Sequence, residues 1–164
     1  MSDVLQGNAE YLDVFEPSPI GDEVAARGLA IVTCMDSRVD PYAMLGMQQG
    51  DAKILRNAGG RVTGDVVRAL VLGSYLLGVS RVLVIAHTDC LMHTGTDADL
   101  HAAIERDNGV DTRAITFHAA KGSLEAALAD DVAKLRSHPL LPRELVVGGA
   151  VYDVETGALS PLDV

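Results

Sequence analysis

Two cysteines and one histidine in this chain have the types and the spacing of a metal site. Cys34 lies in the segment CMDSR, while His87 and Cys90 lie three residues apart in the segment HTDC. Two thiolates and one imidazole suit Zn2+, which prefers tetrahedral nitrogen and sulfur donors. Three protein ligands leave a fourth position open, which is typical of a catalytic rather than a structural zinc site. The sequence therefore predicts a catalytic zinc ion held by these three residues.

An acidic and a basic residue follow the first cysteine closely. Asp36 and Arg38 lie two and four residues after Cys34. Asp36 can take the fourth metal position itself, or it can pair with the bidentate fork of Arg38 and accept a hydrogen bond from a metal-bound water. Zinc lowers the pKa of such a water, so that hydroxide forms near neutral pH. Two thiolates neutralise more of the zinc charge than three imidazoles would, so we expect weaker acidification unless further hydrogen bonds compensate.

Each of these residues also has an ordinary structural explanation. A free cysteine is usually a small buried hydrophobic residue, and an exposed Asp–Arg pair contributes little to stability. The occurrence of all five residues in register favours the metal site. A thiol redox enzyme would usually carry C-x-x-C, which is absent from this sequence. Asp89, inside the HTDC segment, is expected to shape the loop rather than to bind metal.

Composition and charge argue against several other classes of protein. A length of 164 residues suits one domain with a proper hydrophobic core. The net charge of −10 argues against binding to nucleic acid and against docking on an anionic membrane surface. No apolar run approaches the roughly 20 residues that cross a bilayer, and the acidic N-terminus lacks the plan of a secretion signal. We therefore expect a cytoplasmic protein.

Apolar runs and helical spacing alternate along the chain. Strands are predicted over residues 28–33, 52–55, 81–86 and 145–151, and helices over 41–45, 63–77 and 123–136, the last two capped by Thr63 and Ser123. This alternation predicts an α/β fold with a mainly parallel β-sheet flanked by helices. The ending VYDVETGALSPL predicts a C-terminal hairpin or edge strand, and residues 91–117 have the poorest pattern. We expect a single domain over 1–164, with residues 1–27 as an N-terminal helical arm.

The predicted elements place the candidate metal ligands together. Cys34 directly follows the first predicted strand, and His87 directly follows the third. Ligands of open α/β sheets gather beyond the carboxyl ends of the strands, where the strand order reverses. If these two strands are neighbours, both cysteines and the histidine converge at one point.

These motifs resemble those of the β-class carbonic anhydrases. C-x-D-x-R at Cys34, Asp36 and Arg38 is combined with H-x-x-C at His87 and Cys90. The resemblance continues through GDAKILRNAGG, LGVSRVLVIAHTDC and VYDVETG, covers the chain from about Gly28 to its end, and is greatest to the small prokaryotic branch.

The resemblance implies more than the spacing does. It implies reversible hydration of carbon dioxide to bicarbonate and a proton, with Zn2+ on Cys34, His87 and Cys90. It implies that Asp36 and Arg38 form a dyad that orients the zinc-bound hydroxide, and that some relatives close the site by binding this aspartate to zinc. It also implies a homodimer or homotetramer with active sites near the dimer interface.

Three further residues are expected around the substrate pocket. The resemblance places Gly59 and Gly60 close to the site, and a conformational role is favoured because RNAGG lacks the G-x-x-x-x-G-K-[ST] pattern of nucleotide binding. The family usually has glycine where this chain has Leu91, and leucine tolerates neither a positive φ nor close approach as glycine does. The loop is therefore shifted, or the pocket is narrower or more apolar. Two alternatives stay open: hydrolysis of carbonyl sulfide or carbon disulfide at the same zinc site, and a non-catalytic zinc protein.

Overall fold

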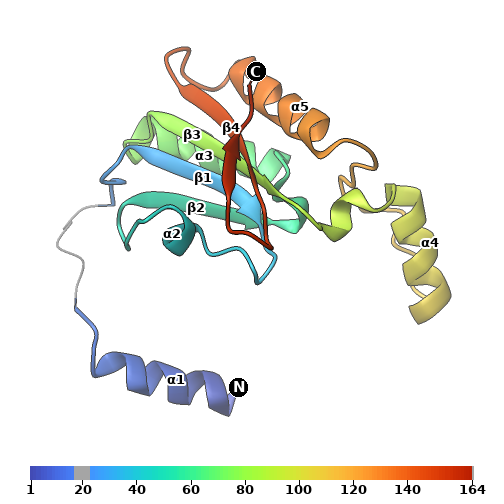
Figure 1. Ribbon diagram of the computed structural model, residues 1–164, viewed down its shortest axis with the longest axis horizontal. Coiled ribbons are helices and arrows are strands. Elements are labelled where there is room, and N and C mark those ends of the chain that lie inside the picture. The colour runs from blue at the N-terminus through green and yellow to red at the C-terminus, as the bar shows by residue number, and fades with distance from the viewer. Residues whose placement is uncertain (17–22, 164) are drawn as a thin grey trace.

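One five-stranded sheet forms the centre of the fold (Figure 1). The computed structural model describes residues 1–16 and 23–163. The strands lie in the order β2-β1-β3-β4-β5, the first four parallel and β5 antiparallel to β4. Their bounds are Leu29–Cys34 (β1), Ala52–Asn57 (β2), Arg81–His87 (β3), Val146–Tyr152 (β4) and Leu159–Pro161 (β5). The predicted α/β class, the mainly parallel sheet and the C-terminal edge strand are confirmed.

Helices fill the connections between the strands. Thr63 and Ser123 cap their helices as predicted, because each side chain accepts a hydrogen bond from a backbone N–H of the first turn. The α-helices are Ser2–Leu12 (α1), Pro41–Met44 (α2), Gly64–Leu76 (α3), Asp97–Asn108 (α4) and Leu124–Arg136 (α5). Two short 3₁₀ helices, Ala58–Gly60 (η1) and Leu91–His93 (η2), follow β2 and β3.

The two faces of the sheet are covered differently. Side chains of α3 and α5 form the larger cluster, with Leu70 and Val132 packed on strand residues such as Val32 and Val84. On the other face Ile31 and Ile85 pack with residues of α2 and the segment after it. β1 is therefore buried on both sides, as its continuous apolar sequence predicts.

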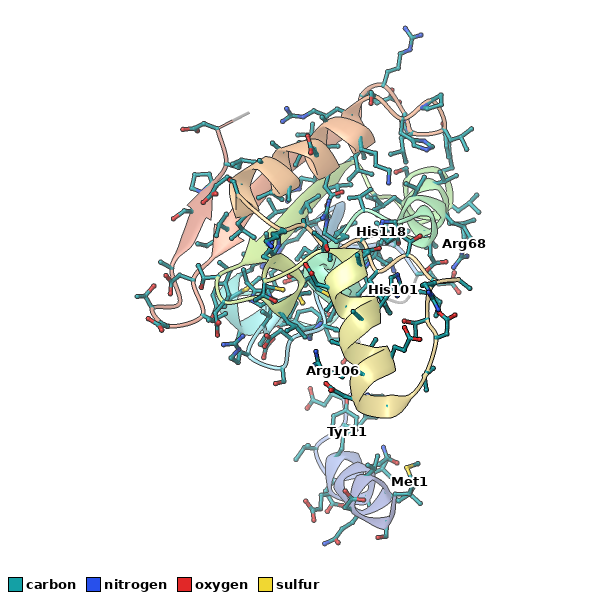
Figure 2. The ribbon with its side chains drawn as sticks, turned by 90° about the vertical axis from the view of Figure 1, so that its right-hand side faces the viewer. Met1, Tyr11, Arg68, His101, Arg106 and His118 are labelled. Atoms are coloured by element: carbon teal, nitrogen blue, oxygen red, sulfur yellow. The ribbon has the colours of Figure 1, made fainter. Side chains whose placement is uncertain are left out.

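Two helices project from this body. α4 was not predicted, since its apolar stripe is limited to Leu100, Ala103 and Ile104, which are only partly buried; a capping box between Thr96 and Asp99 starts it. Figure 2 looks onto α4, with His101 and Arg106 on it, and shows α1 with Tyr11 apart from the sheet. Of the arm predicted over 1–27, residues 2–12 form α1, which buries no side chain, and residues 17–22 lie outside the described part. No helix in the described ranges has the length and hydropathy to cross a membrane.

Candidate metal centre

The carboxyl ends of β1 and β3 bring the predicted ligands together. The two strands are parallel neighbours, and each runs one residue further than predicted, so Cys34 and His87 are their final residues. Cys90 lies on the loop just beyond His87. The Sγ atoms of the two cysteines are 4.0 Å apart, and the ligand atoms of all three residues lie within 4.8 Å of one another. All three side chains are buried, so the group has the compactness of a metal site.

The hydrogen bonding of His87 leaves one nitrogen of its imidazole available to a metal. Its Nδ1 lies 2.8 Å from the carbonyl oxygen of Thr88, a contact in which Nδ1 carries the proton and donates. That tautomer leaves the lone pair on Nε2, which is buried and has no hydrogen-bond partner among the residues that the structure describes. Buried polar atoms nearly always have a partner, so an orphaned nitrogen facing two thiols fits a metal ligand better than a core histidine.

The two thiols differ in their protonation. Cys34 receives a hydrogen bond from Cys90 and a second from the backbone N–H of Gly59, at 3.3 Å. The contact with Cys90, whose Sγ lies 4.0 Å away, is the main cause that lowers the pKa of the Cys34 thiol. The Cys34 thiolate in turn raises the pKa of the Cys90 thiol and of the His87 imidazole. Zinc binds thiolates and neutral imidazoles, so metal binding at this group would release the proton that the raised pKa keeps on Cys90.

Asp36 lies beside this group and is held by Arg38. Oδ1 accepts hydrogen bonds from the backbone N–H of Arg38 at 2.9 Å and from its Nε at 3.0 Å, and Oδ2 accepts one from Nη2 at 2.7 Å. These bonds hold the pKa of the Asp36 carboxyl well below its usual range. Oδ2 is 3.8 Å from Nε2 of His87. The carboxylate is thus ionised and next to the ligands, where it can either bind a metal or accept a hydrogen bond from a metal-bound group.

Glycines after β2 allow the chain to approach the first ligand. Gly60 is buried with φ +64°, and a Cβ there would lie 2.9 Å from the backbone nitrogen of Cys34 and from the carbonyl carbon of Thr33. Gly59, with φ +79°, places its N–H on the Cys34 sulfur. The predicted conformational role of both glycines has a direct structural basis in these contacts.

A cavity opens beside the ligands, and its lining includes Gly59 and Leu91 but not Gly60. The lining residues are Cys34, Met35, Asp36, Ser37, Arg38, Ala58, Gly59, Cys90, Leu91 and Met92. Leu91 does not adopt a positive φ; in this loop the left-handed residue is Asp89, with φ +54°. Leu91 and Met35 both line the cavity and are 69% and 67% exposed to solvent. The leucine therefore alters the rim of the cavity rather than the backbone around the ligands.

Two residues contribute to the site through contacts that the sequence does not predict. Arg56, in the RNAGG segment, donates from Nε to the carbonyl oxygen of Cys34 at 3.0 Å and from Nη2 to that of Asp36 at 2.7 Å. It therefore fixes the backbone that carries both side chains. Asp89 contacts Arg38 across the site, although the sequence analysis expected it only to shape its loop.

Comparison with known proteins gives a consistent result. The model of the carbonic anhydrase family matches residues 29–159. A protein named beta-carbonic anhydrase 1 from Mycobacterium tuberculosis is 35% identical over 159 residues, which cover 96% of this chain and 94% of that protein. A carbon disulfide hydrolase from Saccharolobus solfataricus is 33% identical over 156 residues, covering 81% and 76%. The crystal structure of a carbonic anhydrase from Streptococcus mutans matches with a TM-score of 0.92 and 38% identity, covering 99% and 96%.

Proposed function

Because the chain belongs to the β-carbonic anhydrase family, we propose that it is a zinc lyase that interconverts carbon dioxide and bicarbonate. One observation supports this most directly: a buried group of Cys34, His87 and Cys90 with the ionised carboxylate of Asp36 3.8 Å from Nε2 of the histidine. These three residues would hold zinc, which when bound supplies the positive charge that lets a water lose its proton near neutral pH.

The residues around the ligands have separate tasks in this reaction. Asp36 accepts a hydrogen bond from the attacking water species and so directs its lone pair towards the carbon of carbon dioxide. Arg38 keeps Asp36 ionised and oriented through its two side-chain hydrogen bonds. Leu91 and Met35 border the cavity with apolar surface, which suits an uncharged, weakly polar gas. The proton leaves to solvent or buffer through this opening.

Stopped-flow measurement of carbon dioxide hydration tests the proposal. The assay is run across pH on protein whose zinc content has been determined. We expect turnover with about one zinc per chain. Protein that contains zinc but shows no turnover at any pH would contradict the proposal and leave a non-catalytic zinc site as the better interpretation.

A second candidate keeps the same site and changes the substrate. The apolar rim formed by Leu91 and Met35 would also admit carbonyl sulfide or carbon disulfide, which are linear electrophiles like carbon dioxide. The 33% identity of this chain to a carbon disulfide hydrolase also supports this alternative. Headspace assays with each gas distinguish the two candidates, since hydrolysis of carbon disulfide releases hydrogen sulfide and hydration of carbon dioxide does not.

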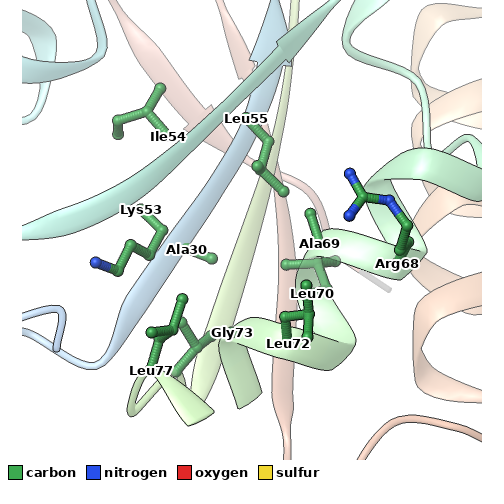
Figure 3. A pocket seen from close by; sticks show the side chains of 11 residues that line it. Ala30, Lys53, Ile54, Leu55, Arg68, Ala69, Leu70, Leu72, Gly73 and Leu77 are labelled. Carbon is green, nitrogen blue, oxygen red and sulfur yellow. The ribbon is translucent and has the colours of Figure 1, made fainter. Parts of the chain in front are cut away.

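We further propose that the chain forms one domain over 1–164, with residues 1–27 as an arm, and assembles as a homodimer or homotetramer. An apolar groove between β2 and α3, shown in Figure 3, supports the assembly. Leu72, Tyr75 and Leu76 of α3 are exposed, and α1 presents Val4, Leu5 and Leu12 to solvent. Light scattering coupled to gel filtration measures the assembly directly. The cytoplasmic location stays a prediction from the sequence.

A further inference from the structure

The guanidinium of Arg38 is held from two sides. Nε and Nη2 donate to the carboxylate of Asp36, at 3.0 and 2.7 Å. On the other side Nη1 donates to Oδ2 of Asp89 at 2.7 Å, and Nη2 also donates to the carbonyl oxygen of Asp89 at 3.0 Å. Nη2 is thus shared between the two aspartates, so the position of one is tied to that of the other.

Asp89 has the backbone conformation that makes this double contact. Its φ of +54° is left-handed, which costs a residue with a Cβ some free energy, although aspartate tolerates it better than most. Such strained residues persist where the surrounding structure holds them, and they gather at functional sites. Here both acceptors of Asp89, its carbonyl oxygen and its carboxylate, meet a single guanidinium. Asp89 also lies between the ligands His87 and Cys90, so the contact links the loop after β3 to the loop after β1.

We propose that Asp89 is a positioning residue of the reaction: it fixes the guanidinium of Arg38, and Arg38 in turn holds Asp36 against the metal ligands. The assignment rests on the proposed function. The guanidinium is planar and rigid, so two contacts with Asp89 set the orientation of the edge that faces Asp36. Without them, Asp36 and Arg38 form only a local pair, two residues apart in sequence, with no side-chain link from Arg38 to the β3 loop.

The solvent exposure of Asp89 and Arg38 sets the size of the effect expected when their contact is lost. The side chain of Asp89 is 78% exposed and that of Arg38 44%, so solvent screens their attraction. Exposed ion pairs change an equilibrium by about two- to fivefold, which is the effect expected on the population of the correctly oriented pair. A catalytic residue in direct contact with the reacting atoms would give a much larger loss.

Two substitutions separate the carboxylate from the backbone conformation. Asp89→Gly removes the carboxylate while glycine adopts the left-handed conformation without strain, so the protein is expected to fold. Asp89→Asn keeps an acceptor oxygen and also tolerates this conformation, and it should restore most of the loss. Asp107→Ala is the matched control, because Asp107 forms an exposed two-bond pair with Arg106, at 2.7 and 2.8 Å, on α4 (Figure 2).

Two readouts are made on the zinc-loaded protein. The first is kcat/KM for carbon dioxide hydration. The second is the rate at which the Nε–H proton of Arg38 exchanges with solvent, measured by nitrogen-15 NMR, with its signal assigned from the spectrum of Arg38→Lys. This proton is bonded to Asp36, so its exchange reports how often the pair opens.

We expect Asp89→Gly to lower kcat/KM about two- to fivefold and to accelerate exchange of the Arg38 proton by a similar factor, at unchanged zinc content. Asp89→Asn and Asp107→Ala should stay close to the parent protein in both. Unchanged exchange and unchanged kcat/KM in Asp89→Gly would overturn the assignment, as would equal changes in Asp107→Ala. If the parent protein fails to hydrate carbon dioxide, the proposed function fails, while the exchange measurement still decides whether Asp89 positions Arg38.

Discussion

Replacing Gly60 with alanine tests how closely the chain approaches Cys34, the first candidate metal ligand. Gly60 is buried and has φ +64°, and an added Cβ would lie 2.9 Å from both the backbone nitrogen of Cys34 and the carbonyl carbon of Thr33. These neighbours are backbone atoms of β1, the strand between β2 and β3 in the sheet, so neither can rotate away as a side chain would. The substitution therefore has to shift either η1 or the end of β1.

The expected loss of stability has two parts. A left-handed conformation costs an L-residue about 1–2 kcal/mol. An extra methyl group in a tightly packed interior costs about 1–3 kcal/mol, giving about 2–5 kcal/mol for Gly60→Ala in total. Gly46→Ala is the matched control, because Gly46 has φ +58° and no atom of the described ranges lies within 4 Å of the added Cβ. Only the cost of the left-handed conformation applies to Gly46→Ala, so the losses of stability of the two variants should differ by about 1–3 kcal/mol.

Urea unfolding followed by circular dichroism measures both variants. Protein and zinc concentrations are held fixed, since ligand binding and assembly shift apparent stability. Competition with a chelator then measures zinc affinity, which should fall in Gly60→Ala because the clash is at Cys34, and should not change in Gly46→Ala. Equal losses of stability and unchanged zinc affinity in the two variants would refute the reasoning from the close contact.

Three further outcomes follow from the site. Asp36→Asn should keep zinc and lower kcat/KM about 100-fold. Because the pKa of Asp36 is lowered, the carboxylate of the parent protein stays ionised, so the ratio of kcat/KM between variant and parent should be constant between about pH 5 and pH 9. In metal-free protein at about pH 6, iodoacetamide should label Cys34 before Cys90, since the pKa of Cys34 is lowered and that of Cys90 raised, and zinc should protect both; peptide mass spectrometry shows the order. Leu91→Gly should raise the rate of carbon dioxide hydration relative to the rate of carbon disulfide hydrolysis. Headspace assays with both gases measure this ratio.

The convergence of the candidate metal ligands could be predicted from the sequence because two local signals agree. Cys34 and His87 each end an apolar run that is long enough for a buried strand, and parallel neighbours align their carboxyl ends. The structure places β1 beside β3, so the pairing of these two strands alone brings Cys34 and His87 together. The caps Thr63 and Ser123 were predictable for the same reason, since each acts within its own helical turn.

The parts that were missed depend on contacts between distant segments or lack an apolar pattern. α4 has no fully buried residue, and its apolar positions Leu100, Ala103 and Ile104 span little more than one turn, so the period that reveals a buried helix is weak and the Thr96–Asp99 capping box is the clearest mark of its start. The contact between Arg38 and Asp89 joins side chains 51 residues apart and depends on the left-handed φ of Asp89. Residue types alone do not reveal which loop residue takes that conformation.

The departure at Leu91 changes the rim of the cavity and leaves the geometry of the candidate metal ligands in place. The loop between the ligands makes its left-handed turn at Asp89, so the residue after Cys90 has no need of glycine's conformational freedom. With leucine at that position, the Sγ atoms of Cys34 and Cys90 are 4.0 Å apart and Nδ1 of His87 contacts the carbonyl oxygen of Thr88. Its exposed side chain instead enlarges the apolar rim of the cavity. Substitutions of Leu91 should consequently change which gas reacts while zinc affinity stays constant. Substitutions of Gly60 should instead lower zinc affinity and leave the choice of gas unchanged.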